Sequence, residues 1–348
     1  MLSPSHQLVR AEAPLRISFV GGGTDLPHWY ERHGGAVLSA TIDHRARVRI
    51  SPRSDREVRI RSLDLGHLVE YHLDEGPSYD GVMDLPKAAI ARMNVDAGLD
   101  VDIASDAPPG SGLGGSSALV TAMVAGLAAL EDRPMAAEVV ARLAHAIERD
   151  DLGIAGGWQD QYASAFGGCN LLEFSAEGVR VSPLGLDEGA LRRLRDHLLL
   201  CYTGSVRTDL GLIHTQVRLY HEGREETIQG MKQLQASAYD LKGLLGSGRF
   251  QELGPMLADA YESKKRMNPH IAEGTAIEAL LEAARRAGAT GGKICGAGGG
   301  GYVLIATPPE RRGEVRSALE PMGAQFAHFA FRPEGVRAWV GERPWSPS

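Results

Sequence analysis

Apolar and polar residues alternate along several segments in the first half of the chain, a pattern that predicts strands. In 15–19 every second residue is apolar, and this segment leads into the sequence GGGTD. The same alternation recurs at 45–50 and 58–61, where arginines fill most of the polar positions. We expect these two arginine-rich segments to form an antiparallel pair, with their charged side chains on a solvated face of a sheet.

Helical periodicity is more prominent in the second half of the chain. A helix at 116–130 follows a short strand at 101–105, and another helix is expected from Pro134 to residue 150. Later helices are expected at 209–222, 225–246, 249–264, 270–287 and 309–321, and later strands at 302–306, 325–331 and 336–340. This mixture predicts an α+β protein with two lobes, residues 1–190 and residues 191–348.

Composition narrows the class of protein. A chain of 348 residues has room for about two domains. Its 37 basic and 44 acidic residues give a net charge of −7, whereas domains that bind nucleic acid are usually basic. Hydrophobic residues make up 43% of the chain and charged residues 23%, which is typical of a folded soluble protein. We therefore expect no nucleic-acid partner.

The cysteines and the apolar stretches indicate the cellular compartment in which the protein is expected. Cys169, Cys201 and Cys295 are too far apart for a disulfide framework or a metal motif, which fits a reducing compartment. The first ten residues lack the apolar run of a signal peptide. The longest uncharged stretch contains a continuous apolar segment only at 118–130, and a membrane span needs about 20 residues. We expect a cytoplasmic protein without a membrane partner.

Glycine is the outlier in the composition, and its positions indicate where chemistry takes place. The chain has 43 glycines among 348 residues, about 12%, against about 7% in an average protein. They cluster at 21–23, 110–115, 153–168 and 288–301. Since no G-x-y period is present, the excess belongs to particular loops rather than to a collagen-like repeat.

The sequence PPGSGLGGSSA at 108–118 lies between a predicted strand and a predicted helix. Its glycines allow backbone amides to converge, and the helix N-terminus adds free N–H groups, so the loop fits a triphosphate with Ser117 facing Mg²⁺. The alternative is a flexible turn with a serine helix cap. The sequence has no Walker loop, and its G-x-G-x-x-G matches at 110–115 and 296–301 lack the context of a Rossmann fold.

Three charged residues are candidates for chemistry. Glu148 lies at the edge of an apolar helix stripe, where it binds Mg²⁺ or pairs with an arginine such as Arg149. Asp160 begins a short helix, either as a general base for a sugar hydroxyl or as a carboxylate that the helix dipole favours. Arg16, on the first strand, either stabilises phosphoryl charge beside an aspartate or forms a structural salt bridge.

Three sequence blocks occur in a fixed order along the chain: APLRISFVGGGTDLP at 13–27, PPGSGLGGSSA at 108–118 and GGKICGAGGGGYVLI at 291–305. Together they resemble the GHMP small-molecule kinases. The resemblance implies a two-lobed α+β fold, with a left-handed βαβ crossover in the N-terminal lobe and a ferredoxin-like C-terminal lobe. GGGTDLP and GWQDQYASAFGGCNLLEF look like the branch of heptose 7-phosphate kinases, to which fucose kinases are close relatives.

The resemblance also implies roles for individual residues. Asp160 is the general base, and Arg16 is its charge partner near the transferred phosphoryl group. Ser117 and Glu148 are the ligands of Mg²⁺, and the loop Gly296–Gly301 closes over the phosphates and the substrate. The residues expected to bind ATP are Pro109, Gly110, Ser111, Gly112, Leu113, Gly114, Gly115, Ser116 and Ser117. Those expected to bind the substrate are Gly22, Gly23, Thr24, Asp25, Asp160, Gly298 and Gly299.

The expected function is ATP-dependent phosphorylation of the anomeric hydroxyl of a sugar. The first expectation is conversion of heptose 7-phosphate to the 1,7-bisphosphate for surface-glycan precursors. Charge placement alone makes Arg207 the first candidate for binding the 7-phosphate, ahead of the cluster at 264–266. The alternative is a kinase of an unphosphorylated sugar such as fucose or galactose, and a dehydrogenase using NAD or a non-catalytic sugar sensor is less favoured. The expected partner is a small sugar or sugar phosphate, and a homodimer is left open.

Overall fold

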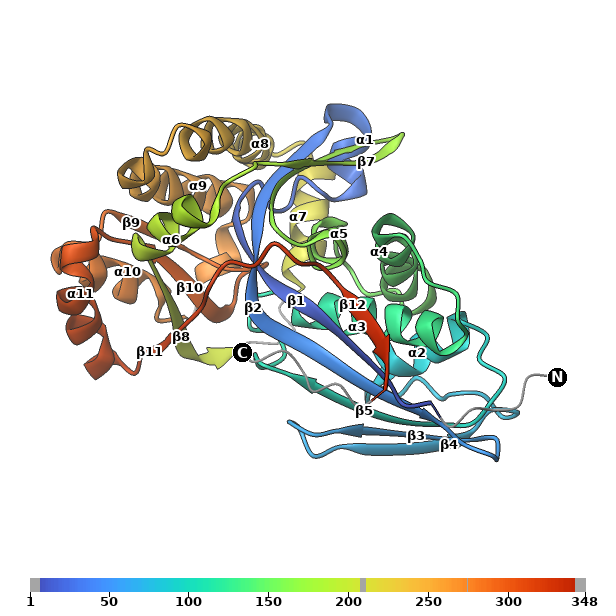
Figure 1. The fold of residues 1–348 in the computed structure, drawn as a ribbon. Coiled ribbons are helices and arrows are strands. Elements are labelled where there is room, and N and C mark those ends of the chain that lie inside the picture. The colour runs from blue at the N-terminus through green and yellow to red at the C-terminus, as the bar shows by residue number, and fades with distance from the viewer. Residues whose placement is uncertain (1–6, 207–210, 274, 342–348) are drawn as a thin grey trace.

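The computed structural model describes residues 7–206, 211–273 and 275–341. Two β-sheets organise these residues, and each sheet is covered by helices (Figure 1). The architecture agrees with the predicted α+β class. None of the described helices combines the length and the hydropathy that crossing a membrane requires.

The larger sheet has eight strands, in the hydrogen-bonded order β12-β1-β2-β5-β3-β4, with β6 and β7 added beside β2. Its strands are β1 (Val9–Val20), β2 (Gly35–Pro52), β3 (Glu57–Ser62), β4 (Leu68–His72), β5 (Leu99–Ser105), β6 (Cys169–Ser175), β7 (Gly178–Pro183) and β12 (Arg337–Val340). The alternation at 15–19 falls within β1, as predicted. Arg16 and Ser18 on its polar face are buried as well, because that face lines a cavity between the lobes.

The predicted antiparallel pairing of 45–50 with 58–61 is wrong. Strand β5 lies between β2 and β3, so that Val101 is opposite Ile50 on one side and Ile60 on the other. β5 is antiparallel to β2 and parallel to β3. Alternation determines which face of a strand is apolar but not which strand is its neighbour, and the parallel pair needs the longer connection that β4 and a helix provide.

Helices cover one face of the larger sheet. They are α2 (Asp84–Arg92), α3 (Gly115–Leu130), α4 (Ala137–Ala146) and α5 (Gln159–Phe166), and α1 (Pro27–His33) follows the GGGTD turn. α3 is apolar around most of its circumference, because it packs between the sheet and the neighbouring helices. The helix predicted to end at residue 150 instead changes at Ile147–Asp151 into a π-helical turn that contains Glu148. Such turns are frequent at functional sites.

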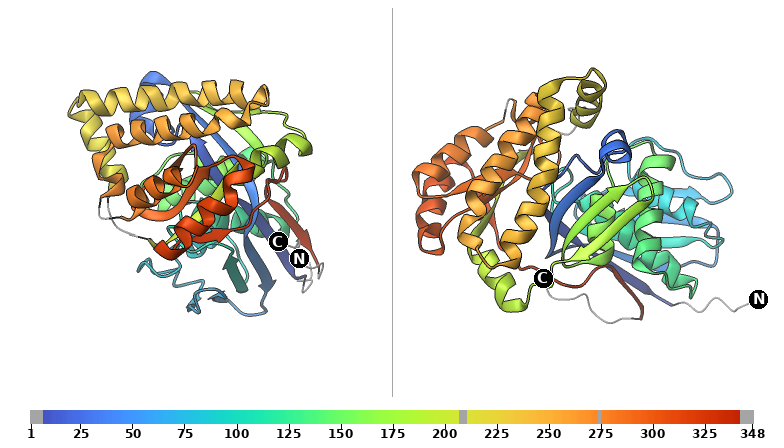
Figure 2. Two further views of the ribbon diagram at one scale, coloured as in Figure 1. Left: turned by 90° about the vertical axis from the view of Figure 1, so that its left-hand side faces the viewer. Right: turned by 90° about the horizontal axis from the view of Figure 1, so that it is seen from above.

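The smaller sheet is antiparallel, in the order β11-β8-β10-β9. Its strands are β8 (Leu198–Val206), β9 (Gly291–Ile294), β10 (Gly300–Ala306) and β11 (Gln325–Ala327), and its helices are α6 (Glu188–Asp196), α7 (Leu212–His221), α8 (Glu225–Gly246), α9 (Leu253–Met267), α10 (Ile277–Arg286) and α11 (Arg312–Leu319). α8 has the bounds that the periodicity predicts. It packs along α9, and together they contact both sheets (Figure 2).

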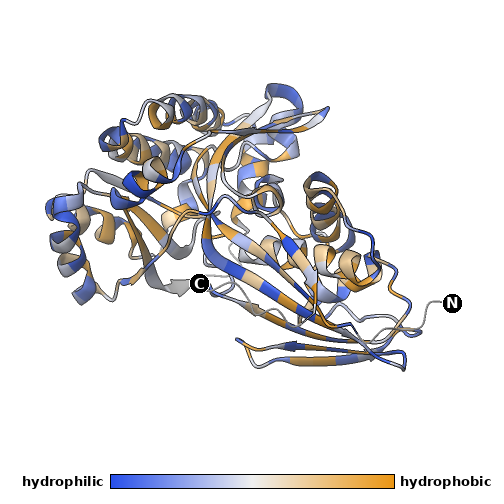
Figure 3. Cartoon of the chain, viewed as in Figure 1, coloured by the Kyte–Doolittle hydropathy of each residue, from blue (hydrophilic) through white to orange (hydrophobic). Residues whose placement is uncertain are grey.

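The two lobes share a hydrophobic core and one strand. One cluster of buried apolar residues includes residues of both lobes, and the outer faces of the helices are coloured mostly as hydrophilic in Figure 3. Strand β12 leaves the second lobe and pairs with β1, where the buried Glu12 accepts a hydrogen bond from Arg337 over 2.5 Å. The end of the predicted C-terminal lobe, 191–348, therefore contributes to the larger sheet, and the limit at residue 190 stays a prediction.

Candidate active site

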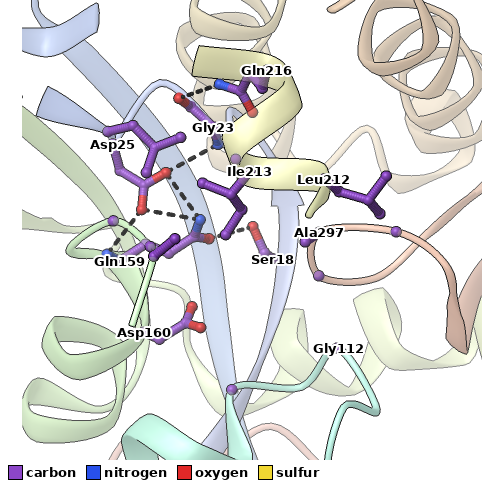
Figure 4. Close-up of a pocket in the computed structure, with 18 of the residues that line it drawn as sticks. Ser18, Gly23, Asp25, Gly112, Gln159, Asp160, Leu212, Ile213, Gln216 and Ala297 are labelled. Carbon is purple, nitrogen blue, oxygen red and sulfur yellow. Dashed lines mark hydrogen bonds between the residues drawn. The ribbon is translucent and has the colours of Figure 1, made fainter. Parts of the chain in front are cut away.

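A cavity of about 540 Å³ lies between the lobes. The larger sheet contributes Arg16 and the GGGTD turn, the start of α3 contributes the glycine-rich loop, and α7, α9 and the loop at 296–298 close the other side. Figure 4 shows Asp25, Gln159 and Asp160 on one side of this space, with Ala297 and Gly112 on the other. All three sequence blocks therefore meet at one site.

Arg16 and Asp160 form an ion pair at the wall of this cavity. The Arg16 Nε and Nη2 atoms lie 2.8 and 2.6 Å from Asp160 Oδ1. Arg16 Nη1 donates to the carbonyl oxygen of Gly112 over 2.6 Å, so the same guanidinium also holds the glycine-rich loop. Arg16 is 3% exposed and Asp160 is 25% exposed, which leaves the carboxylate accessible from the cavity. The arrangement positions a carboxylate beside a fixed positive charge.

Ser117 and Glu148 lie beside Gln161, which the sequence interpretation missed. Gln161 Nε2 donates to Ser117 Oγ over 3.1 Å and to Glu148 Oε1 over 2.9 Å. Glu148 is 3% exposed, and its burial raises the pKa of its carboxyl group, although Arg149 Nη1, 3.2 Å from Glu148 Oε2, acts in the opposite direction. Gln161 Oε1 is buried and has no hydrogen-bond partner among the described residues. Three oxygen-bearing side chains thus gather here, and hard oxygen ligands are those that Mg²⁺ prefers.

The GGGTD turn is tied to the start of α5 by Asp25. Asp25 Oδ2 accepts from the backbone amide of Gln159 over 3.2 Å, and Oδ1 accepts from Gln159 Nε2 over 3.1 Å (Figure 4). Burial and the nearby Asp160 raise the pKa of the Asp25 carboxyl group. A Cβ atom on Gly157 would lie 2.0 Å from Asp25 Oδ2, which explains the glycine at that position. Asp25 lines the cavity and also holds two loops together, and its role as a substrate ligand stays a prediction.

The two glycine-rich loops are in direct contact. Gly112 has a φ of +84°, and a Cβ there would lie 2.7 Å from the carbonyl oxygen of Cys295. The Tyr302 amide donates to the Ser111 carbonyl over 2.9 Å. The loop at 296–301 therefore packs onto the loop at the start of α3, and only glycine permits this approach.

Comparison with known proteins gives the family. The GHMP kinases N terminal domain matches residues 82–168, and the GHMP kinases C terminal domain matches residues 233–325. The chain is 32% identical to D-glycero-alpha-D-manno-heptose 7-phosphate kinase from Campylobacter jejuni, over 95% of this chain and 98% of that protein. The chain belongs to the GHMP kinase family. It is a sugar kinase, a phosphotransferase with an alcohol group as acceptor.

Two further similarities extend this comparison. A crystal structure of a D-glycero-D-manno-heptose 1-phosphate kinase from Bacteroides thetaiotaomicron superposes with a TM-score of 0.79 at 29% identity, covering 97% of this chain and all of that chain. L-fucokinase/L-fucose-1-P guanylyltransferase from Bacteroides fragilis is 28% identical over 90% of this chain, which spans 36% of that longer protein. The fold of this GHMP kinase is therefore the one that the three sequence blocks implied.

Most residues predicted to bind ligands line the cavity, and a few do not. The predicted residues that line it are Arg16, Gly22, Gly23, Asp25, Gly110, Ser111, Gly112, Gly114, Gly115, Ser116, Ser117, Glu148, Asp160 and Gly298. Pro109, Leu113 and Gly299 are not among the lining residues, and the Leu113 side chain lies in the core. Arg207 lies outside the described residues.

Thr24 is a correction to the predicted substrate ligands. It is fully buried, and its hydroxyl donates to the carbonyl oxygen of Gly21 over 2.8 Å and accepts from the amide of Ala36 over 3.1 Å. These bonds hold the GGGTD turn against β2. The residue therefore shapes the turn, while its neighbours Gly23 and Asp25 face the cavity.

Four polar residues in or beside the cavity escaped the sequence interpretation or were ranked low in it: Gln159, Lys264 and Lys293 line the cavity, and Gln161 is buried behind it. Gln159 and Gln161 flank Asp160, and their neighbours in space come from distant segments that periodicity does not connect. Lys293 stands in an otherwise uncharged glycine-rich block, a signal that could have singled it out. Lys264 was a secondary candidate within a cluster expected to be solvated, and the structure buries it in the cavity.

Proposed function

We propose that this GHMP kinase transfers the γ-phosphoryl group of ATP to the anomeric hydroxyl of D-glycero-D-manno-heptose 7-phosphate, producing the 1,7-bisphosphate. The observation that carries the proposal is the Arg16–Asp160 pair, which lies where the glycine-rich loops meet the GGGTD turn. Similarity to the Campylobacter jejuni heptose 7-phosphate kinase over nearly the full length of both proteins supports this choice of sugar.

The glycine-rich loop and the start of α3 bind the triphosphate in this proposal. α3 begins at Gly115. Its N-cap residue is Gly114, and no described side chain forms a capping hydrogen bond at this end of the helix. The first amides of a helix have no partner within the helix and carry a partial positive charge, so they suit phosphate oxygens. Ser116 and Ser117 add hydroxyl groups in the same turn.

Ser117 and Glu148 would hold Mg²⁺, and the Gln161 Oε1 beside them, which has no hydrogen-bond partner within the described part of the chain, fits a site for a hard cation. When bound, the ion neutralises charge on the phosphates of the nucleotide. Gln161 fixes the orientation of the Ser117 hydroxyl and of the Glu148 carboxylate through the two hydrogen bonds from its Nε2. The protein holds the side-chain oxygens of Ser117, Glu148 and Gln161 close together in a buried site.

Asp160 acts as the general base. No described hydrogen bond engages its Oδ2, whereas Oδ1 is held by Arg16, so Oδ2 is the atom that takes the proton from the sugar hydroxyl. Because the transition state of phosphoryl transfer is loose, the enzyme works mainly by alignment and by charge neutralisation. Arg16 contributes to both, since it fixes Asp160 and carries a positive charge near the transferred group.

A panel of acceptors tests the proposal. ADP release is measured with heptose 7-phosphate, unphosphorylated heptose, fucose and galactose, and phosphorus NMR locates the new phosphate. We expect the highest kcat/KM with heptose 7-phosphate and a product phosphorylated at the anomeric carbon. The similarity to the fucokinase makes an unphosphorylated sugar the second candidate, and a higher kcat/KM with fucose would establish it.

A further inference from the structure

Two buried lysines line the active-site cavity. Lys264 on α9 is 6% exposed and Lys293 on β9 is 4% exposed. The Lys264 ammonium donates to the carbonyl oxygen of Gly296, and Lys293 Nζ donates to the carbonyl oxygen of Ser18 over 2.8 Å. Among residues 7–206, 211–273 and 275–341, no carboxylate forms an ion pair with either lysine.

A third buried lysine, Lys87, differs from these two because it has carboxylate partners. Lys87 is 2% exposed, and its Nζ lies 2.9 Å from Asp80 Oδ1 and 3.1 Å from Asp84 Oδ1. A buried ammonium group normally has such carboxylate partners, because an unpaired buried charge is costly. Lys264 and Lys293 have only carbonyl partners, so their charges lack compensation within the described protein.

The groups around Lys264 make the local charge strongly positive. Lys293 from β9 and Arg16 from β1 face it, while Asp25 and the thiol of Cys295 are the groups that could oppose its charge. Burial, Lys293 and Arg16 lower the pKa of Lys264 to about 7. Arg16 is already paired with Asp160 and Arg149 with Glu148, so among the described lysine and arginine side chains of the cavity the two lysines are those without a carboxylate partner.

The Gly296 carbonyl, which accepts a hydrogen bond from Lys264, lies where the two glycine-rich loops meet. Gly296 belongs to the loop that packs on Gly112, and Gly112 also accepts from Arg16. Lys264 is therefore held at the junction of both glycine-rich loops. An ammonium group has three N–H donors, and the one hydrogen bond described for Lys264 leaves the others for a ligand.

We propose that Lys264 binds oxygens of a phosphate group of the reactants, and that Lys293 is a positioning residue that adds positive charge behind it. The proposal rests on the phosphoryl transfer proposed above. The phosphate belongs either to the sugar phosphate or to the γ-phosphoryl group of ATP, and both present the same anionic oxygens. Binding of the dianion compensates the two lysines, which explains why the fold retains charges that destabilise it without ligand.

The test compares Lys264→Met with Lys265→Met. Lys265 is the next residue on α9, but its ammonium pairs with Glu262 and Glu278 and it does not line the cavity. We expect Lys264→Met to lose about tenfold to a hundredfold in kcat/KM, since a hydrogen bond to a charged group contributes about 1.5–3 kcal/mol. Lys265→Met should stay within about twofold of the unmodified kinase, because it removes a charge that is paired with two exposed carboxylates outside the cavity.

The acceptor distinguishes the two sources of phosphate. If Lys264→Met raises the KM for heptose 7-phosphate but leaves kcat/KM for unphosphorylated heptose unchanged, Lys264 binds the phosphate of the sugar. If Lys264→Met lowers kcat by the same factor with both acceptors, Lys264 binds the transferred phosphoryl group. Equal kcat/KM for Lys264→Met and the unmodified kinase with every acceptor would overturn the proposal, as would an equal loss in Lys265→Met.

A binding measurement separates this proposal from the proposed function. The rise in melting temperature on adding ATP, or on adding heptose 7-phosphate alone, is compared between the variants. We expect Lys264→Met to have a melting temperature no lower than the unmodified kinase without ligand, and a smaller rise with the phosphate-bearing ligand that it binds. If no sugar were phosphorylated at its anomeric carbon, the proposed function would fail while these ligand-induced shifts still tested Lys264. Should Lys264→Met not fold, Lys293→Met takes its place, with a loss of at least about threefold in kcat/KM expected and no change contradicting the proposal.

Discussion

Two nitrogens of Arg16 hold a single oxygen of Asp160, so the other carboxylate oxygen is left to the cavity. This relationship joins a strand near the start of the chain to a helix 144 positions later. It combines a fixed orientation with one available proton acceptor. Several consequences can be measured.

Asp160→Asn is expected to lower kcat by about 10²-fold to 10⁴-fold, the range that a general base contributes. The amide keeps the shape of the side chain and a possible oxygen contact with Arg16, but it does not accept a proton. ADP release measures kcat, and the rise in melting temperature with added ATP measures nucleotide binding. Turnover close to that of the unmodified kinase would show that another group takes the proton.

Arg16→Lys tests the geometry of the guanidinium rather than its charge alone. Arg16 contacts Asp160 and Gly112 with three different nitrogens, and a lysine offers only one. We expect a fall in kcat of about tenfold to a hundredfold, together with a lower melting temperature, because the partly buried carbonyl of Gly112 loses its donor. If Arg16→Lys retained both kcat and melting temperature, a point charge would be sufficient at this position.

Glu148→Gln is expected to raise the Mg²⁺ concentration needed for half-maximal activity by at least about tenfold, because a neutral amide is a weaker ligand for a hard cation. Burial raises the pKa of the Glu148 carboxyl group, so removing its charge should not lower the free energy of unfolding. The measurement is a titration of activity with magnesium chloride. Glu138→Gln, an exposed residue on the preceding helix, is the matched control and should leave the titration unchanged.

Lys264 makes a defined contribution to the pH dependence of stability. Its pKa in the folded kinase is lowered to about 7, whereas an unfolded lysine stays protonated up to about pH 10.4. Between these values the unfolded chain binds more protons at this position, so the contribution of Lys264 to the free energy of unfolding rises with pH. Below about pH 7 the residue is charged in both states, and its full destabilising effect is present.

Comparison of urea denaturation at pH 7, 8 and 9 measures this contribution. Lys264→Met should have the higher free energy of unfolding at pH 7, and the difference from the unmodified kinase should shrink as the pH rises. The slope for one proton is at most about 1.4 kcal/mol per pH unit. Parallel pH dependences for both proteins would mean that Lys264 has an ordinary pKa.

The sequence predicted the fold class and the site far better than the sheet order. Alternation identified β1, and periodicity located α8, because these signals depend on nearby residues. The insertion of β5 between β2 and β3 depends on contacts distant in sequence, and alternation carries no record of them. The π-helical turn at Glu148 escaped because it lies at the end of the helix, where no later helical residues would reveal a shift of the apolar stripe.

The candidate site shows the same division. Asp160, Arg16, Ser117 and Glu148 belong to recognisable blocks, and the structure brings them to one cavity. The contacts of Gln161 and Lys264 depend on the meeting of distant segments, so the sequence interpretation missed Gln161 and ranked Lys264 low. Thr24 illustrates the opposite error, because a residue inside a functional block serves the shape of the turn.

Strand β12 has a consequence for how this kinase can be divided. It carries the end of the second lobe back to β1, with Glu12 and Arg337 joined across the pair. A single cut between the lobes would therefore yield a first piece without its outermost strand. The bared backbone of β1 would be open to pairing with other chains, which promotes aggregation. The two lobes are therefore not independent modules. Replacing the second lobe by that of a relative requires that the relative's final strand pairs with β1.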